Sequence, residues 1–154
     1  MSRLEVGARA PLFSLANQDG EKISASSLKG ERFVLYFYPA DDTPGCTKEA
    51  CGFNDELSAF RDLGVRVLGV SPDDAASHIA FRAKFHLDFD LLSDPTKSTM
   101  EAYGAYGEKM LYGKKVVGVI RSTFVIGPTG LIENAWYGVR TDGHAQRVRA
   151  AIKS

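Results

Sequence analysis

The chain has 154 residues, the usual size of one domain, and we expect a single domain spanning residues 1–154. Hydrophobic residues make up 44% of it, enough for a core that needs no disulfide or metal to fold. Its 19 basic residues balance 19 acidic ones, which argues against a nucleic-acid-binding or membrane-surface-binding protein.

The N-terminal stretch has no continuous apolar segment of the signal-peptide kind, and the longest apolar run, residues 33–38, is far shorter than a membrane span. We therefore expect a cytoplasmic protein that makes no contact with membranes. Two cysteines are too few for a disulfide-stapled secreted domain. In a reducing compartment such a pair is more often catalytic or redox-active, although both cysteines could also be buried as small apolar residues.

The hydrophobic pattern predicts alternating strands and helices. Residues 33–38 form an apolar, aromatic-rich run, typical of a strand covered on both faces, and Pro39 ends it. Apolar residues spaced three and four apart predict a helix from about Pro44 to Leu63, with Gly64 as its C-terminal cap. The other expected elements are a weak strand within 19–30, strands at 65–70, 89–94, 116–126 and 131–138, and helices at 74–86, 96–106 and 142–152.

This order of elements predicts an α/β fold, with a central mixed β-sheet flanked by helices. In such a fold the carboxyl end of the strand at 33–38 opens onto the start of the helix that follows it. α/β proteins commonly place their chemistry at a junction of this kind, so we expect the functional residues between positions 39 and 46.

Cys46 lies in the first turn of that helix, and Pro44 suits its first position. Free backbone N–H groups there carry a partial positive charge, which would stabilise a thiolate, the form of cysteine that attacks an O–O bond. The alternative is a buried structural cysteine. The position at a strand–loop–helix junction favours the reactive cysteine.

Three further residues could serve such a thiolate. Thr43 could cap the helix, hydrogen-bond an oxygen of a bound peroxide or carboxylate, or do both. Arg121 interrupts the apolar strand at 116–126, so it either pairs with an anion such as the thiolate or extends to water from an edge. Glu49 lies on a similar helix face to Cys46 and could orient Arg121, but we expect it to be a solvated helix residue.

Cys51 follows Cys46 by five residues, which on an intact helix separates the two Cα atoms by roughly 8–9 Å. Disulfides usually need less than about 7 Å. A Cys46–Cys51 disulfide therefore requires the start of the helix to unwind, and we expect oxidation to be accompanied by local unfolding. Alternatively, Cys51 is a core residue that never pairs.

We expect neither a metal nor an organic cofactor. The three histidines, His78, His86 and His144, have no ligand spacing with one another or with the cysteines. A Cys-x4-Cys pair without a second pair is a poor zinc signal.

The segment PADDTPGCTKEAC (39–51) closely resembles the active-site region of the peroxiredoxins, whose pattern Pro-x3-Thr-x2-Cys is matched by Pro39, Thr43 and Cys46. The second cysteine, Cys51, resembles that of the bacterioferritin comigratory protein, or Q-type, subfamily. The similarity covers almost the whole chain, and Arg121 stands at the position of the family's active-site arginine.

The resemblance implies a thioredoxin-like fold with an N-terminal extension, and the reduction of hydrogen peroxide and organic hydroperoxides. It implies that Cys46 becomes a sulfenic acid, that Thr43 and Arg121 hold the peroxide, and that Pro39 shields the pocket. Cys51 would then form an intramolecular disulfide, which a thioredoxin-type dithiol protein reduces. It also implies that no cofactor is needed and that the protein is a monomer.

Two other functions stay open at this point. A thioredoxin-like dithiol–disulfide oxidoreductase would have the same fold, but its cysteines follow the spacing Cys-x2-Cys rather than Cys-x4-Cys. A redox sensor would unfold its helix when Cys46 is oxidised, and would bind a partner in response without catalytic turnover.

Overall fold

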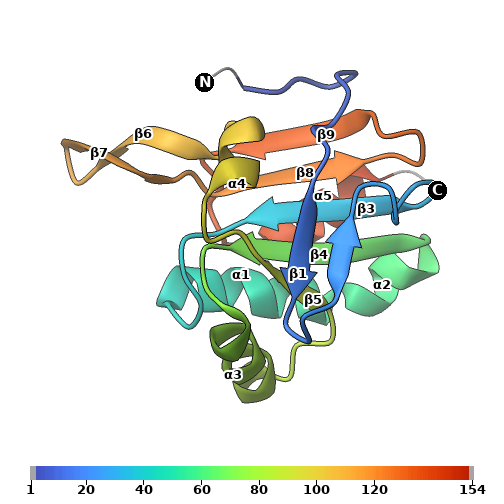
Figure 1. Ribbon diagram of the computed structural model, residues 1–154, viewed down its shortest axis with the longest axis horizontal. Helices are drawn as coiled ribbons and strands as arrows, with labels where there is room; N and C mark the ends of the chain where they lie inside the picture. Colours follow the sequence, from blue (N-terminus) through green and yellow to red (C-terminus); the bar gives the residue numbers. More distant parts are fainter. Residues whose placement is uncertain (1–2, 153–154) are drawn as a thin grey trace.

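The computed structural model describes residues 3–152, so residues 1–2 and 153–154 of the expected domain lie outside the described residues. A seven-stranded sheet in the order β2-β1-β5-β4-β3-β8-β9 lies beside a separate hairpin of β6 and β7 (Figure 1). The strands are β1 Ser14–Asn17, β2 Lys22–Ser24, β3 Arg32–Phe37, β4 Val65–Ser71, β5 Asp90–Ser93, β6 Tyr106–Leu111, β7 Lys114–Val119, β8 Ser122–Ile126 and β9 Ile132–Tyr137, and the helices are α1 Pro44–Asp55, α2 Leu57–Asp62, α3 Ala75–Phe85, α4 Ser98–Ala102 and α5 His144–Ala151.

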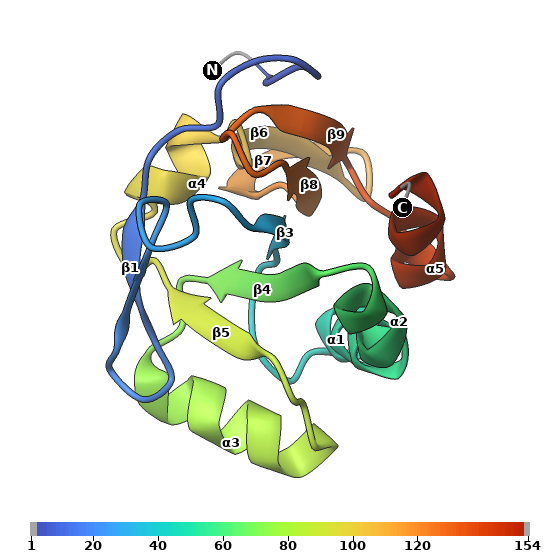
Figure 2. The same cartoon turned by 90° about the vertical axis from the view of Figure 1, so that its right-hand side faces the viewer.

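The sheet is mixed and is covered on both faces, as the sequence predicts. β3 pairs in parallel with β4 and antiparallel with β8. Because side chains alternate along β3, Val34 and Tyr36 pack with α1, α2 and α5 on one face, whereas Phe33, Leu35 and Phe37 pack on the other face, which α4 covers. Figure 2 shows α1, α2 and α5 on one side of β3 and β4, and α4 on the other.

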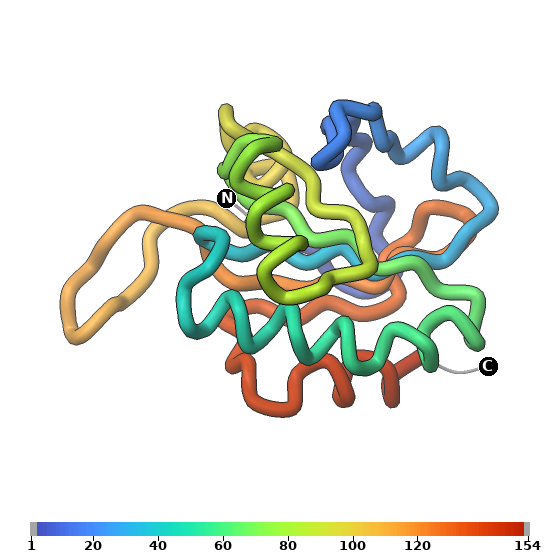
Figure 3. The backbone as a smooth tube through the Cα atoms, turned by 90° about the horizontal axis from the view of Figure 1, so that it is seen from below, coloured from blue at the N-terminus to red at the C-terminus, as the bar shows by residue number. Residues whose placement is uncertain are grey.

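The direction of β3 and β4 determines which loops meet. Because the two strands run parallel, their carboxyl ends lie at the same edge of the sheet. The pairing extends by one residue beyond β3, since the Tyr38 N–H donates to the Val70 carbonyl at 3.0 Å. Residues 39–43, which follow β3, therefore lie beside residues 72–74, which follow β4. In Figure 3 α1 starts from this edge of the sheet.

The single helix expected at 44–63 is wrong, because the structure has two helices there. α1 ends at Asp55, and Glu56 separates it from α2 with backbone angles outside the helical range. Asn54 favours a helix end because its side chain bonds other backbone groups, here the His86 carbonyl and the Asp88 N–H. Gly64 follows α2 with φ 71°, the left-handed conformation expected of a C-terminal glycine cap.

The strand expected at 116–126 is also wrong in its middle. β7 ends at Val119 and β8 begins at Ser122, so Arg121 lies between two strands and not within one. The two strands belong to different sheets, since β7 pairs with β6 and β8 pairs with β3 and β9. The chain must turn between them, and the Ile120 N–H donates to the Ala105 carbonyl at 2.7 Å in this turn.

The remaining expected elements are found with their ends shifted by a few residues, except that the helix expected at 96–106 is shortened to α4. The strands β1 and β6 were not predicted. None of the helices within residues 3–152 has the length and the apolar character needed to cross a lipid bilayer.

Candidate active site

Cys46 lies in the first turn of α1, and only 1% of its surface is exposed. The first backbone hydrogen bond of the helix runs from the Thr47 N–H to the Thr43 carbonyl, at 2.8 Å. The N–H groups of Gly45 and Cys46 precede this bond and have no partner inside the helix. Together with the helix dipole they place partial positive charge beside the Cys46 sulfur.

The guanidinium of Arg121 contacts this sulfur. Nη2 of Arg121 donates to Sγ of Cys46 at 3.3 Å, and Nη1 donates to Oε1 of Glu49 at 2.6 Å. Burial alone would lower the pKa of Arg121, but the negative charges of Glu49 and Cys46 outweigh burial and raise it. Gly45 makes room for the guanidinium, because a Cβ at this position would lie 3.3 Å from Nη2.

The expectation that Glu49 is solvated is wrong. Only 1% of its surface is exposed, because the face of α1 that carries Cys46 packs against the sheet. Burial raises the Glu49 pKa to about 7, although the charge and the hydrogen bond of Arg121 act to lower it. Its second oxygen, Oε2, has no hydrogen-bond partner among the described residues. When Glu49 is protonated it carries no charge, and the positive charge of Arg121 then acts on the Cys46 sulfur without a competing carboxylate.

Glu49→Gln is expected to remove a pH-dependent loss of stability. Because the Glu49 pKa is about 7 in the folded state against an ordinary value of 4.5, the folded protein keeps a proton that the unfolded chain releases. The free energy of unfolding therefore falls by at most about 3 kcal/mol as the pH rises through this window. Urea denaturation of both proteins at about pH 5 and about pH 8 measures the difference. An equal decline in both would show that Glu49 is not the titrating group.

Thr43 occupies the N-cap position of α1 but does not act as a side-chain cap. Its hydroxyl donates instead to the carbonyl of Ala40 at 3.2 Å, so the cap interaction, one of the two roles open to Thr43, is not formed. The hydroxyl is exposed at the start of the helix. Pro39 is half-buried between β3 and α1, on the loop that leads to Cys46.

Cys51 lies on the same helix as Cys46, and both thiols are free. α1 is continuous across the two positions, so their Cα atoms are separated by roughly 8–9 Å. Cys51 is half-buried, and burial, together with the negative charge of Asp55, raises its pKa. Cys51 therefore stays protonated at neutral pH in the reduced protein.

Within residues 3–152, no group of three or more His, Cys, Asp or Glu side chains could hold a metal ion. His144 is buried, and its Nε2 shares a hydrogen bond with the Thr123 hydroxyl at 2.8 Å. Burial and the charges of Arg147 and Arg121 lower its pKa to about 4.

A mixed sheet flanked by helices, with a thiol at a helix start facing a guanidinium, defines a thiol-dependent redox protein of the thioredoxin-like class. The model of the AhpC/TSA family matches residues 6–135. The chain is 48% identical over 145 residues to a protein described as a putative peroxiredoxin bcp of Coxiella burnetii, covering 94% of this chain and 96% of that protein.

Solved structures give the same result. PrxQ of Xylella fastidiosa is 36% identical, with a TM-score of 0.90 and coverage of 97% of this chain and 96% of that one. A bacterioferritin comigratory protein of Xanthomonas campestris, studied for its alkyl peroxide reduction activity, is 40% identical, with a TM-score of 0.85 and coverage of 90% and 88%. The chain belongs to the AhpC/TSA family, among the Bcp and PrxQ peroxiredoxins, and is a thiol peroxidase.

Proposed function

We propose that the protein reduces hydrogen peroxide and organic hydroperoxides through Cys46, that Cys51 resolves the oxidised Cys46, and that a thioredoxin-type dithiol protein restores both thiols. The observation that carries this proposal is the 3.3 Å contact between Nη2 of Arg121 and Sγ of Cys46 at the start of α1. The alkyl peroxide reduction described for the Xanthomonas campestris relative supports the inclusion of organic hydroperoxides.

In the first step the Cys46 thiolate attacks the terminal oxygen of the peroxide. The S–O bond forms as the O–O bond breaks, and the departing oxygen takes up a proton and leaves as water or an alcohol, so that Cys46 becomes a sulfenic acid. Arg121 and the free N–H groups at the start of α1 would stabilise the charge that develops on the breaking bond. Thr43 would hold a peroxide oxygen, and Pro39 would shield the pocket.

In the second step Cys51 attacks the sulfur of the Cys46 sulfenic acid. The S–S bond forms, the S–O bond breaks, and water leaves with the proton of the Cys51 thiol. The separation of roughly 8–9 Å between the Cα atoms must shrink below about 7 Å, so the start of α1 has to unwind. Gly45 and Gly52 favour this, because glycine is a weak helix former.

In the third step a thioredoxin-type dithiol protein reduces the Cys46–Cys51 disulfide by thiol–disulfide exchange and becomes a disulfide itself. The unwound segment would present the disulfide to this partner. While α1 is folded, Cys46 is only 1% exposed, which would keep a protein disulfide from reaching its sulfur. This burial argues against a dithiol–disulfide oxidoreductase that acts on proteins.

We also propose that the protein acts as a monomer in the cytoplasm. A single chain supplies all the proposed site residues, so the site does not need a second copy. These residues are Cys46, Cys51, Thr43, Glu49 and Arg121. Light scattering coupled to size-exclusion chromatography tests whether the protein is a monomer, since elution as a stable dimer would contradict the proposal.

A coupled assay tests the proposed cycle. With thioredoxin, thioredoxin reductase and NADPH, we expect NADPH to be consumed when hydrogen peroxide or cumene hydroperoxide is added, and we expect negligible reduction of insulin. Efficient insulin reduction with negligible peroxide consumption would identify a dithiol–disulfide oxidoreductase instead. Peroxide turnover with glutathione alone, and none with thioredoxin, would remove the proposed reductant.

A further inference from the structure

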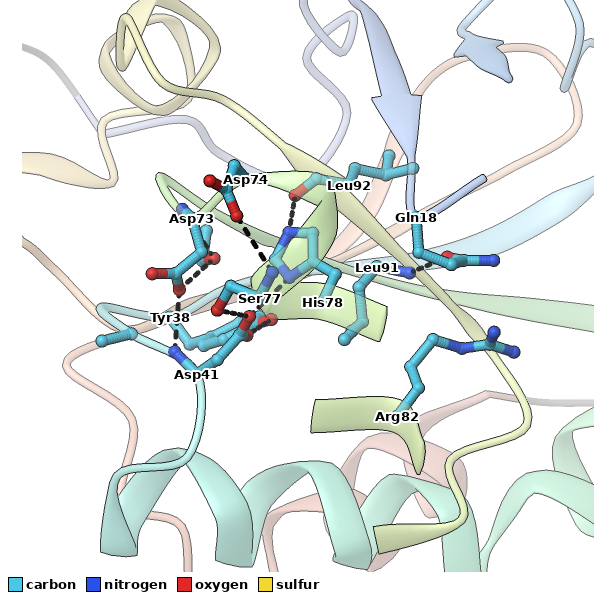
Figure 4. A network of polar contacts seen from close by, with 12 residues as sticks. Gln18, Tyr38, Asp41, Asp73, Asp74, Ser77, His78, Arg82, Leu91 and Leu92 are labelled. Atoms are coloured by element: carbon cyan, nitrogen blue, oxygen red, sulfur yellow. Dashed lines mark hydrogen bonds and ion pairs between the residues drawn. The ribbon is translucent and has the colours of Figure 1, made fainter. Parts of the chain in front are cut away.

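A buried polar network holds Asp41, which lies in the loop just before Cys46 (Figure 4). Oδ1 of Asp41 accepts from the Tyr38 hydroxyl at 2.5 Å. Oδ2 accepts from the Ser77 hydroxyl at 2.8 Å and lies 2.7 Å from Nδ1 of His78. The side chain of Asp41 is 3% exposed and that of His78 is 0% exposed. The loop that leads to the nucleophile is thus fastened to α3 from inside the protein.

Both ring nitrogens of His78 lie within hydrogen-bond distance of oxygen atoms. Nε2 lies 3.0 Å from the Leu92 carbonyl, which only accepts, so Nε2 carries a hydrogen. Burial acts to raise the pKa of Asp41, but the hydrogen bonds from His78 and Tyr38 hold it below its usual value. Nδ1 of His78 lies on the opposite side of the ring, 2.7 Å from Oδ2 of Asp41. His78 thus joins the loop to β5 through contacts at both ring nitrogens.

The backbone of Asp41 is held as well. Its N–H donates to Oδ2 of Asp73 at 2.8 Å, and the Ser71 hydroxyl donates to the same oxygen at 2.8 Å. By contrast, the ion pair of Asp42 and Lys84 joins this loop to α3 at the exposed surface. Exposed ion pairs contribute little to stability. The anchorage of the loop therefore rests on Asp41.

A second fixed point lies further along α1. Phe53 is fully buried, its ring stacks on Tyr36 with centroids 4.6 Å apart, and it meets the edge of His144 at 5.8 Å. The helical residues before Phe53, residues 44–52, include three buried side chains, Cys46, Glu49 and Ala50. The segment that must unwind to join Cys46 to Cys51 is thus bounded by Asp41 on one side and by Phe53 on the other.

We propose that His78 is a positioning residue for the peroxidase cycle. Through Asp41 it keeps the loop at 39–43 in place, with Pro39 and Thr43, while residues 44–52 unwind and refold in each turnover. This inference rests on the proposed Cys46–Cys51 disulfide. It makes the pair of Asp41 and His78 the boundary of the unfolding segment, so that α1 refolds against a loop already shaped to hold a peroxide.

Nitrogen NMR of the His78 ring in the reduced and oxidised wild-type protein tests this directly. We expect both ring nitrogens to stay hydrogen-bonded in both forms, while the amide signals of residues 44–52 shift on oxidation. A His78 ring that becomes solvent-exposed on oxidation would overturn the inference. Mass spectrometry of the same sample detects the disulfide separately. If it is absent, the proposed function fails and the inference fails with it, whereas a disulfide with a released His78 overturns the inference alone.

A variant pair tests the positioning role. His78→Phe keeps a buried ring but removes both hydrogen-bonding nitrogens. We expect it to slow the oxidation of Cys46 by peroxide by about tenfold to a hundredfold in protein that circular dichroism shows to be folded. Lys84→Met, which removes only the exposed pair with Asp42, is expected to react like the wild type. A folded His78→Phe variant within about twofold of the wild-type rate would contradict the positioning role. If His78→Phe does not fold, the NMR measurement on the wild type decides.

Discussion

Arg121→Met is expected to slow the reaction of Cys46 with hydrogen peroxide by about 10²–10³-fold. The side chain of Arg121 is the cation in contact with the Cys46 sulfur, and it is 17% exposed, so water screens its charge only in part. Methionine keeps much of the packing volume but provides neither the charge nor the two donors. Stopped-flow measurement of Cys46 oxidation in the pre-reduced protein gives the rate, and the ultraviolet absorbance of the thiolate shows whether its titration moves to higher pH.

Arg32→Met provides the matched control for Arg121→Met. Arg32 also pairs with a glutamate, since its Nε donates to Glu133 at 2.7 Å, but it lies at the opposite end of β3 from the loop that leads to Cys46. If the slower reaction came from losing any arginine–glutamate pair, both variants would be slow. If it comes from losing the contact with Cys46, only Arg121→Met is slow. An unaltered rate in Arg121→Met would remove this residue from the active site.

Cys51→Ser is expected to leave the oxidation of Cys46 intact and to reduce thioredoxin-driven turnover to the background of the assay. Without the Cys51 thiol no intramolecular disulfide can form, so the Cys46 sulfenic acid persists and is open to further oxidation. A sulfenic-acid-specific probe followed by mass spectrometry detects this species, and the NADPH-coupled assay measures the turnover.

Cys46→Ser provides the comparison for Cys51→Ser, because it keeps the second thiol and loses the first oxidation itself. The two variants should therefore fail at different steps, one before and one after the sulfenic acid. Unchanged turnover in Cys51→Ser would show that a thiol outside this chain resolves Cys46.

The sequence predicts the centre of the fold well because the signal there is strong and local. The apolar run at 33–38 and the turn residues after it identify β3 and the junction that carries Cys46. The edge of the fold gives a weaker signal: β6 is largely exposed, and its residues 106–111 lack a buried face. β7 and β8 are predicted as one strand, with Arg121 inside it, because residues 116–126 are almost continuously apolar.

The site itself was predictable only where its residues are neighbours in sequence. The position of Glu49 on the helix face of Cys46 follows from helical periodicity, but its partner Arg121 lies 72 residues further along the chain. The contact between Asp41 and His78 spans 37 residues and exists because β3 and β4 are parallel, so that the segments after them meet. No local pattern in the sequence encodes either contact.

Thiol mapping after a single oxidation tests the central claim most directly. One equivalent of hydrogen peroxide is added to the fully reduced protein, and the state of both cysteines is followed by mass spectrometry over time. We expect a Cys46–Cys51 disulfide to form rapidly and thioredoxin to return both residues to free thiols. If both thiols were still free after prolonged exposure to peroxide, Cys46 would not be the peroxide-reacting group.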